Sequence, residues 1–264
     1  MPTPKLFVLA DYPWGVDIVR HLLSRKETIV GAALASPETE GPLNRGCSES
    51  LRALLSLPQE QILRADKLES KAGRERVRQI KPDIILSLFW SSILRPDFLA
   101  LSPDAINIHL SLLPYNRGAN PNVWAIVEGT PAGVTMHYMD EGTDTGDIIA
   151  QKEVPIESTD TGKSLYQKLT ATAVELFKSA WPQVAAGATQ RKKQPGGGTA
   201  HLRRDYAQLA EIKLDEPTTA RKVIDHLRAK TFPPFPGAFF VDDEGKRIQA
   251  RIELANLDEH EQKN

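Results

Sequence analysis

Three polar side chains, Asn107, His109 and Ser111, alternate with apolar residues in the segment 105–118, which reads AINIHLSLLPYNRG. This period of two predicts a β-strand with one polar face. A single histidine on a strand is more often a packed residue than a working one. An amide, an imidazole and a hydroxyl in one row, just before a loop that begins near Pro114, could instead bind a substrate and move protons.

A second segment, 133–149, reads GVTMHYMDEGTDTGDII and predicts a strand, a tight turn and the start of another strand. The turn is acidic, since it holds Asp140, Glu141, Asp144 and Asp147. Solvation of an exposed turn explains most of these charges. It does not explain the Thr-Asp-Thr-Gly sequence around Asp144, which favours a functional turn.

Together, the two segments resemble the family of formyltransferases that use N10-formyltetrahydrofolate. The resemblance rests on Asn-x-His at a strand end (Asn107 and His109), on a Ser-Leu-Leu-Pro loop followed by Arg117-Gly118, and on Asp144 before Thr-Gly. It covers most of residues 83–180. It implies that Asn107, His109 and Asp144 are the catalytic residues.

Formyl transfer to an amine requires a proton carrier that works near neutral pH and a donor for the oxyanion that forms. His109 suits the first role, and the amide of Asn107, two residues away on the same face, suits the second. A carboxylate from Asp144 would favour the protonated imidazole or order a water that relays protons. No metal is needed, and His137 and His201 lack the spacing of metal ligands.

By the same resemblance, the folate would be held mainly by a loop that follows a buried strand, DIILSLF. The predicted folate contacts are Phe89, Trp90, Ser92, Ile93, Leu94 and Asp140. Two adjacent aromatic residues are also ordinary core material. Bifunctional sugar-modifying relatives have an arginine where this chain has Ala119. Here either Arg117 or backbone groups would replace it, or the folate tail would be held differently.

The stretch RGANPNVWAIVEG looks like members that act on 4-amino-4,6-dideoxy sugars linked to a nucleoside diphosphate. This predicts formyl transfer to such a sugar for surface polysaccharide, as in lipopolysaccharide O-antigen biosynthesis. A methionyl-tRNA formyltransferase-like enzyme is an alternative, but residues 206–264 carry both signs of charge, whereas tRNA binding requires Lys and Arg. Purine-synthesis relatives carry a glycine-rich first turn that this chain lacks.

Two further alternatives are a non-catalytic protein that binds folate or a nucleotide sugar, and a hydrolase that deformylates the folate. A non-catalytic protein would lack the catalytic residues, whereas Asn107, His109 and Asp144 are all present here. The hydrolases usually carry an additional N-terminal regulatory domain, and this chain starts at its first strand.

Five residues are predicted to contact the sugar nucleotide. Tyr12 and Trp14 follow the first strand, where ligands bind in open α/β sheets, and could stack on a base. Arg117 lies in the loop after His109. Asn120 and Asn122 begin a helix whose free N–H groups could meet phosphate or a sugar hydroxyl.

The chain opens with a strand at residues 5–10, then Ile18, Val19, Leu22 and Leu23 at helical spacing, and a second strand at 28–34. This order favours a parallel sheet. The glycine-rich dinucleotide fingerprint is absent after the first strand, where the chain reads ADYPWG. The predicted fold class is α/β: a Rossmann-like, mostly parallel sheet with helices on both faces. A small C-terminal α+β unit, a helix with a hairpin, would follow it.

Three consecutive glycines predict a flexible linker at 191–205, between a catalytic domain at 1–190 and a small domain at 206–264. The small domain has too few residues for a robust core of its own. The alternating hairpin at 238–254 would leave an unpaired edge that invites a partner strand. We therefore expect a homodimer.

Composition is ordinary for a soluble globular protein, with 264 residues, 41% hydrophobic residues and a formal net charge of −1. This near-neutral charge gives no global field that attracts nucleic acid. The single cysteine, Cys47, excludes an internal disulfide framework. No stretch approaches the roughly 18 apolar residues of a membrane span, and no signal peptide opens the chain, so we expect a cytoplasmic protein without membrane contact.

Overall fold

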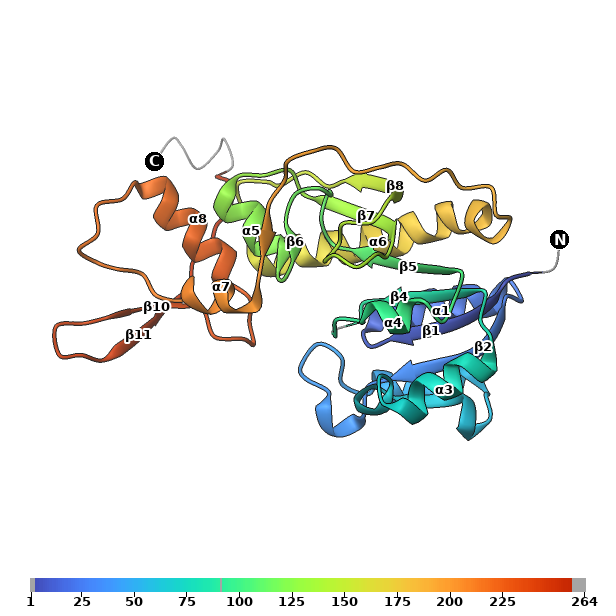
Figure 1. The fold of residues 1–264 in the computed structure, drawn as a ribbon. Coiled ribbons are helices and arrows are strands. Elements are labelled where there is room, and N and C mark those ends of the chain that lie inside the picture. The colour runs from blue at the N-terminus through green and yellow to red at the C-terminus, as the bar shows by residue number, and fades with distance from the viewer. Residues whose placement is uncertain (1–2, 91, 258–264) are drawn as a thin grey trace. The chain divides into compact units, whose positions relative to one another are not determined.

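The computed structural model describes residues 3–90 and 92–257 (Figure 1). Seven strands in this part of the chain form one sheet in the order β3-β2-β1-β4-β5-β7-β8. Their bounds are Lys5–Ala10 (β1), Thr28–Leu34 (β2), Ile62–Arg64 (β3), Ile84–Leu88 (β4), Asp104–His109 (β5), Gly133–Tyr138 (β7) and Ile148–Glu153 (β8). The pairs from β3 to β5 are parallel, and β7 runs antiparallel to β5. The predicted mostly parallel sheet is confirmed.

Helices cover both faces of the sheet because the central strands are apolar on both sides. Helix α1 (Pro13–Ser24) lies on the face of Ala10, since Gly15 approaches both that residue and its paired neighbour Leu88. Phe7 and Leu9 point to the other face and join a buried cluster with side chains of α3 (Lys71–Ile80) and α4 (Pro96–Leu99). A further helix, α2 (Cys47–Leu55), contacts α1.

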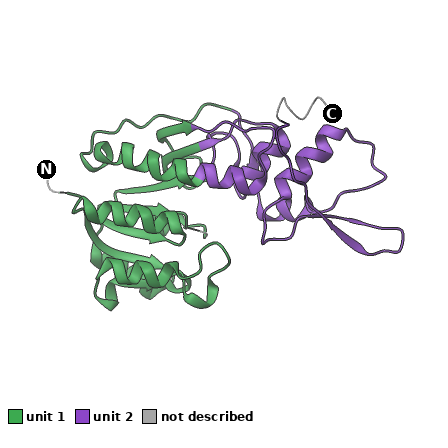
Figure 2. Cartoon of the chain, turned by 180° about the vertical axis from the view of Figure 1, so that it is seen from behind, with its two compact units in different colours: residues 1–109, 134–152, 170–196 green, residues 110–133, 153–169, 197–264 purple. Residues whose placement is uncertain are grey.

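The described chain divides into two compact units (Figure 2). The first contains residues 1–109, 134–152 and 170–196, and the second contains residues 110–133, 153–169 and 197–264. These units interleave along the sequence, so their borders differ from a cut at 191–205. The predicted domain limits remain a prediction.

The first unit also contains short 3-10 helices at Pro37–Thr39, Gln59–Gln61 and Ala65–Lys67, and the second unit contains the other elements. They are β6 (Arg117–Gly118), α5 (Pro121–Glu128), β9 (Ala200–His201), α7 (Arg203–Gln208), α8 (Ala220–Lys230), β10 (Ala238–Val241) and β11 (Arg247–Ala250). The predicted C-terminal hairpin is present, because β10 and β11 pair antiparallel. Helix α6 (Gly162–Ala185) belongs to both units. Within the described ranges, no helix combines the length and the apolar character needed to cross a bilayer.

Residues 197–201, which lie in the predicted flexible linker, form a strap along the loop that contains Arg117. The strap is parallel to this loop, since β9 pairs with β6. The carbonyl oxygens of Thr199 and His201 accept hydrogen bonds from the N–H groups of Arg117 and Ala119, both at 2.9 Å. The side-chain hydroxyl of Thr199 also accepts from the N–H of Asn116 at 2.9 Å. Of the three consecutive glycines, Gly198 permits a close contact with Pro114, whereas Gly196 and Gly197 border open space.

Substitution of Gly118 should reveal the close contact between the strap and this loop. Gly118 has φ +86°, and a Cβ atom added there would lie 2.3 Å from the carbonyl oxygen of His201. A left-handed conformation alone costs a side chain about 1–3 kcal/mol. We expect Gly118→Ala to lower the free energy of unfolding by more than this strain alone, because the strap must also move. Urea denaturation measures the change.

Gly129→Ala provides the matched control. Gly129 has φ +64°, but nothing lies within 4 Å of an added Cβ atom. This variant should show only the strain of the left-handed backbone. If Gly118→Ala and Gly129→Ala destabilise the protein equally, the strap does not constrain this loop.

The start of α6 is held by Asp160, whose side chain is buried with 4% exposure. Its carboxylate accepts hydrogen bonds from the N–H of Glu157 at 2.8 Å, the hydroxyl of Ser164 at 2.8 Å and Nζ of Lys168 at 2.9 Å. Burial by itself would raise the pKa of Asp160. The hydrogen bonds and the charge of Lys168 outweigh burial and hold the pKa below its ordinary value of 3.8.

A pH-dependent loss of stability follows for Asp160→Asn. Because the folded carboxyl has the lower pKa, its stabilisation is present above the unfolded pKa and is lost as the pH falls through the folded pKa. At pH 7 we expect the variant to be less stable by about 1.5–3 kcal/mol. Urea denaturation across pH should show this difference shrinking below about pH 4. A difference that is independent of pH would mean that the charge of Asp160 is not what stabilises the helix.

Candidate active site

The polar residues of β5 meet polar residues of β7 because the two strands pair antiparallel. Asn107 lies opposite His137, and His109 lies opposite Thr135. Side chains of directly opposed residues share a face of the sheet. The register therefore places a second histidine beside the two residues that the sequence singled out on β5.

Asp144, from the turn between β7 and β8, completes a polar cluster with Asn107, His109 and His137. One carboxylate oxygen, Oδ2, lies 3.5 Å from Nδ1 of His109. The other, Oδ1, lies 3.5 Å from Nε2 of His137 and 3.4 Å from Nδ2 of Asn107. The side chains of His109 and Asp144 are 10% and 13% exposed. The three residues predicted to be catalytic are thus brought together, and the side chains of His109 and Asp144 keep a small accessible surface.

His137 is the member of the polar cluster that the sequence did not single out. Its Nδ1 lies 2.7 Å from the carbonyl oxygen of Tyr138, which can only accept, so Nδ1 carries the proton. In the neutral ring Nε2 is then an acceptor, and Nδ2 of Asn107 lies 3.3 Å away to donate to it. His137 thereby fixes which way the Asn107 amide points. The sequence shows polar residues on both strands, but only the pairing of β5 with β7 reveals that these residues share one face of the sheet.

The backbone at Asp144 has φ +54°, in the left-handed region that aspartate tolerates better than most residues. Such conformations persist where the surrounding structure determines them, and they are frequent at functional sites. The Thr-Gly that follows also has a role, since a Cβ atom on Gly146 would lie 1.9 Å from the carbonyl oxygen of Tyr138. The turn can therefore close tightly onto the end of β7.

The predicted folate contacts after β4 divide into two groups. Leu94 is buried in the core cluster, and Trp90 packs partly against it, whereas Ser92 and Ile93 are exposed. The indole N–H of Trp90 is buried and has no hydrogen-bond partner among the described residues. An unmatched buried donor next to exposed loop residues fits a site for a ligand that carries acceptors.

Phe89 and Asp140, the other two predicted folate contacts, shape the loops on which they lie. Phe89 has φ +60°, which turns the chain sharply at the end of β4. Asp140 is exposed, and its Oδ1 accepts from the N–H of Gly142 at 3.1 Å and from the hydroxyl of Thr145 at 2.5 Å. Asp140 thus orders the acidic turn from within.

The five predicted substrate contacts fall into both units. In the first unit, Tyr12 and Trp14 stack with ring centroids 5.7 Å apart, and Trp14 meets Phe89 edge-on at 5.8 Å. Both rings are half-buried, so they can pack and still present a surface.

The other three predicted substrate contacts, Arg117, Asn120 and Asn122, lie in the second unit, around the start of α5. Arg117 and Asn120 are half-buried, and the helix begins after Asn120 and ends at Gly129, as expected from the sequence. Asn120 does not cap the helix with its side chain, because its own backbone is left-handed. Asn122 is buried, and its amide donates to the carbonyl oxygen of Gly162 at 2.8 Å. Because its amide is buried and already hydrogen-bonded, Asn122 offers a substrate little accessible surface.

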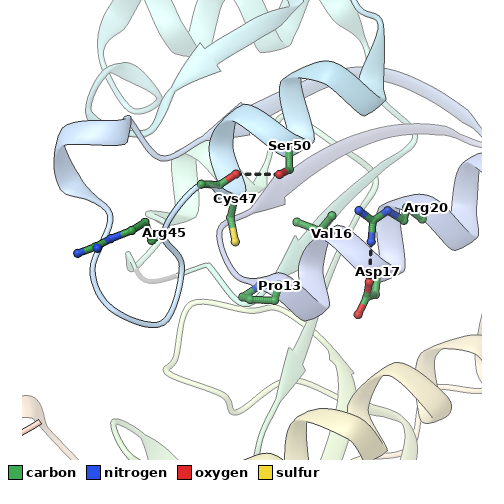
Figure 3. Close-up of a pocket in the computed structure, with 8 residues that line it drawn as sticks. Pro13, Val16, Asp17, Arg20, Arg45, Cys47 and Ser50 are labelled. Carbon is green, nitrogen blue, oxygen red and sulfur yellow. Dashed lines mark hydrogen bonds and ion pairs between the residues drawn. The ribbon is translucent and has the colours of Figure 1, made fainter. Parts of the chain in front are cut away.

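A pocket of about 180 Å³ lies between α1 and α2 in the first unit, with Pro13, Val16, Arg20, Arg45, Cys47 and Ser50 among its lining residues (Figure 3). It includes none of the predicted site residues. Ligand sites for molecules of cofactor size occupy roughly 300–1,000 Å³. Burial raises the pKa of the Cys47 thiol to about 11, so this cysteine is a weak nucleophile. The pocket is therefore separate from the proposed chemistry.

Comparison with known proteins matches residues 9–181 to the formyl transferase family and residues 205–256 to an N-formyltransferase dimerization C-terminal domain. A dTDP-4-amino-4,6-dideoxyglucose formyltransferase from Mycobacterium bovis is 35% identical over 182 residues, which are 68% of this chain and 77% of that protein. The crystal structure of a 4-N formyltransferase from Francisella tularensis superposes with a TM-score of 0.81 at 28% identity. The match covers 96% of this chain and 99% of that one.

A formyltransferase from Anoxybacillus kamchatkensis, solved in complex with UDP-4,6-dideoxy-4-formamido-L-AltNAc and tetrahydrofolate, superposes with a TM-score of 0.56 at 28% identity. This match covers 86% of this chain and 100% of that one. The family match spans well over half of the present chain and includes the whole polar cluster. The protein therefore belongs to the formyl transferase family and is a formyltransferase.

Proposed function

We propose that this enzyme transfers the formyl group of N10-formyltetrahydrofolate to the amino group of a nucleotide-linked 4-amino-4,6-dideoxy sugar. The observation that carries the proposal is the polar cluster, in which the Asp144 carboxylate lies 3.5 Å from Nδ1 of His109 and 3.4 Å from Nδ2 of Asn107. The relative from Mycobacterium bovis, named for such a sugar, supports this choice of acceptor.

The polar cluster supplies the groups that formyl transfer requires. In this proposal Nε2 of His109 takes the proton that the attacking amine loses as its nitrogen bonds to the formyl carbon. The same proton can then go to N10 of the folate as the bond between N10 and the formyl carbon breaks. Asp144, at Nδ1 of His109, favours the protonated imidazole in between.

Asn107 is proposed to donate an N–H to the formyl oxygen as negative charge develops there. Both amide hydrogens of Asn107 lie near acceptors in the free enzyme, Nε2 of His137 at 3.3 Å and Oδ1 of Asp144 at 3.4 Å. These are long hydrogen bonds, so a stronger oxyanion acceptor can compete for one of the two hydrogens. His137 would keep the amide nitrogen turned towards the reacting group.

The folate is proposed to lie against the loop after β4 and against the acidic turn. It supplies the formyl group, and the chain supplies the unmatched N–H of Trp90, the exposed loop residues Ser92 and Ile93, and the turn ordered by Asp140. Phe89 would shape this loop through its left-handed backbone, and Leu94 would anchor the loop in the buried core cluster. No group of three or more His, Cys, Asp and Glu in the described ranges is arranged as a metal site.

The sugar nucleotide is proposed to contact Tyr12 and Trp14 by stacking and Arg117 and Asn120 by polar groups. The C-terminal unit is proposed to form a homodimer, which the match to a dimerization domain supports. A formylated dideoxy sugar of this kind would serve a surface polysaccharide such as an O-antigen.

A thermal-shift screen tests the proposal and identifies the nucleotide. The purified protein is heated with dTDP, UDP or GDP, each with and without 5-formyltetrahydrofolate. A ligand at a hundred times its Kd adds roughly 2.7 kcal/mol to the free energy of unfolding. Stabilisation by dTDP or UDP supports a sugar acceptor carrying that base. Stabilisation by the folate alone keeps formyl transfer but contradicts the sugar acceptor, and tRNA would then be tested.

A further inference from the structure

Gln194 reaches the turn that carries Asp144 from a segment far along the chain. Its Nε2 donates to the carbonyl oxygen of Asp144 at 2.8 Å and to the carbonyl oxygen of Gly146 at 2.9 Å. We propose that Gln194 is a positioning residue, which holds the Asp144 carboxylate against His109 for catalysis. The inference rests on the proposed function, because it assumes that Asp144 takes part in formyl transfer.

The turn at Asp144 needs support from outside itself. Asp140 orders part of it, by accepting hydrogen bonds from the N–H of Gly142 and the hydroxyl of Thr145. Asp144, whose backbone is left-handed, lies between these two contacts, and neither is made to its own backbone. A residue in this conformation is held by its surroundings rather than by its own preference. Gln194 binds the carbonyl of this residue and the carbonyl two residues later, and so holds the chain that leaves the left-handed residue.

The segment that carries Gln194 is itself fixed to the sheet. Lys192 exchanges two backbone hydrogen bonds with Ile148 at the start of β8, at 2.7 and 3.1 Å. The guanidinium of Arg191 lies 3.6 Å from the ring centroid of Tyr138 and pairs with Asp104. The side chain of Gln194 therefore extends from an anchored backbone, which is what a positioning group requires.

The chemistry of the contact selects an amide. Both partners are carbonyl oxygens, which only accept, so the side chain must offer two N–H groups from one place. A glutamine amide does so without adding charge next to Asp144. A carboxylate of the same length would offer none and would point its oxygens at two acceptors. Gln194→Glu should therefore be more harmful than Gln194→Ala, although it is the closer match in shape.

The first test is kinetic. We expect Gln194→Ala to lower kcat by about tenfold to a hundredfold with little change in KM for the nucleotide sugar, because a misplacement of about 1 Å can cost a hundredfold in rate. Gln194→Glu should lose more. Lys193→Ala, at the exposed neighbouring position, is the control and should keep the native rate.

A double-mutant cycle separates positioning from general support of the fold. If Gln194 acts through Asp144, Gln194→Ala should have almost no effect on kcat in an Asp144→Asn background. Losses that multiply in the double variant, or a near-native kcat for Gln194→Ala, would overturn the inference even if formyl transfer is real.

Hydrogen exchange tests the same inference without any assay of turnover. In Gln194→Ala the backbone amides of residues 141–147 should exchange faster, while those of β5 keep their protection. Unchanged exchange in the turn would overturn the inference. A wild-type enzyme without sugar formylation, combined with faster exchange in the variant, would instead contradict the proposed function and leave the support of the turn intact.

Discussion

His109→Ala is expected to lower kcat by about 10²–10⁴-fold, which is the contribution typical of a positioned acid–base group. The imidazole lies at the end of β5, with its Nδ1 3.5 Å from Asp144, and no other group of the polar cluster can replace it. His137 is engaged at both ring nitrogens, because its Nδ1 donates to the carbonyl oxygen of Tyr138 and its Nε2 lies 3.3 Å from the amide nitrogen of Asn107. Steady-state kinetics with the nucleotide sugar and N10-formyltetrahydrofolate measures the loss.

A folding measurement and a control variant accompany His109→Ala. Far-UV circular dichroism and the unfolding midpoint should show a folded protein, since β5 is held by both of its neighbouring strands. His21→Ala, which removes a half-buried histidine whose ring packs edge-on against Phe177, is the matched control and should keep its turnover. A near-native rate for His109→Ala would mean that another group carries the proton.

Asp144→Asn is expected to give the second large loss, of about a hundredfold or more in kcat. The substitution keeps the shape of the side chain but removes the negative charge that faces two histidines and the Asn107 amide. The neutral amide no longer stabilises the positive charge that His109 gains as it takes the proton of the attacking amine. The pH–rate profile of kcat/KM should therefore change in form as well as in height.

Glu141→Gln is the control for Asp144→Asn, because it removes the same charge from an exposed position in the same turn. Its rate and its pH–rate profile should match the wild type. An Asp144→Asn enzyme with an unchanged profile would exclude the carboxylate from the proton transfer, and Asp144 would then be only a structural part of the turn.

Much of the fold could be predicted because the local patterns agree with one another. The apolar runs of β1 and β4, the polar row of β5 and the helix between Asn120 and Gly129 all lie where periodicity and end signals place them. These patterns are local, and they predict the structure correctly because the strands with apolar sequences are the ones that the sheet buries.

The parts that could not be predicted depend on contacts between distant segments. His137 is a site residue only because β7 pairs with β5 in a register that sets it opposite Asn107. The glycines at 196–198 predicted flexibility, yet a Cβ atom on Gly198 would lie 2.2 Å from the carbonyl oxygen of Pro114. Composition cannot distinguish a glycine that gives freedom from one that permits close approach.

One assay tests the central proposal most directly. The purified enzyme is incubated with N10-formyltetrahydrofolate and dTDP-4-amino-4,6-dideoxyglucose, and the sugar nucleotide is analysed by mass spectrometry. We expect a product heavier by one CO unit, formed in equal amount with tetrahydrofolate and lost in His109→Ala. An unchanged sugar nucleotide, with methionyl-tRNA formylated under the same conditions, would contradict it.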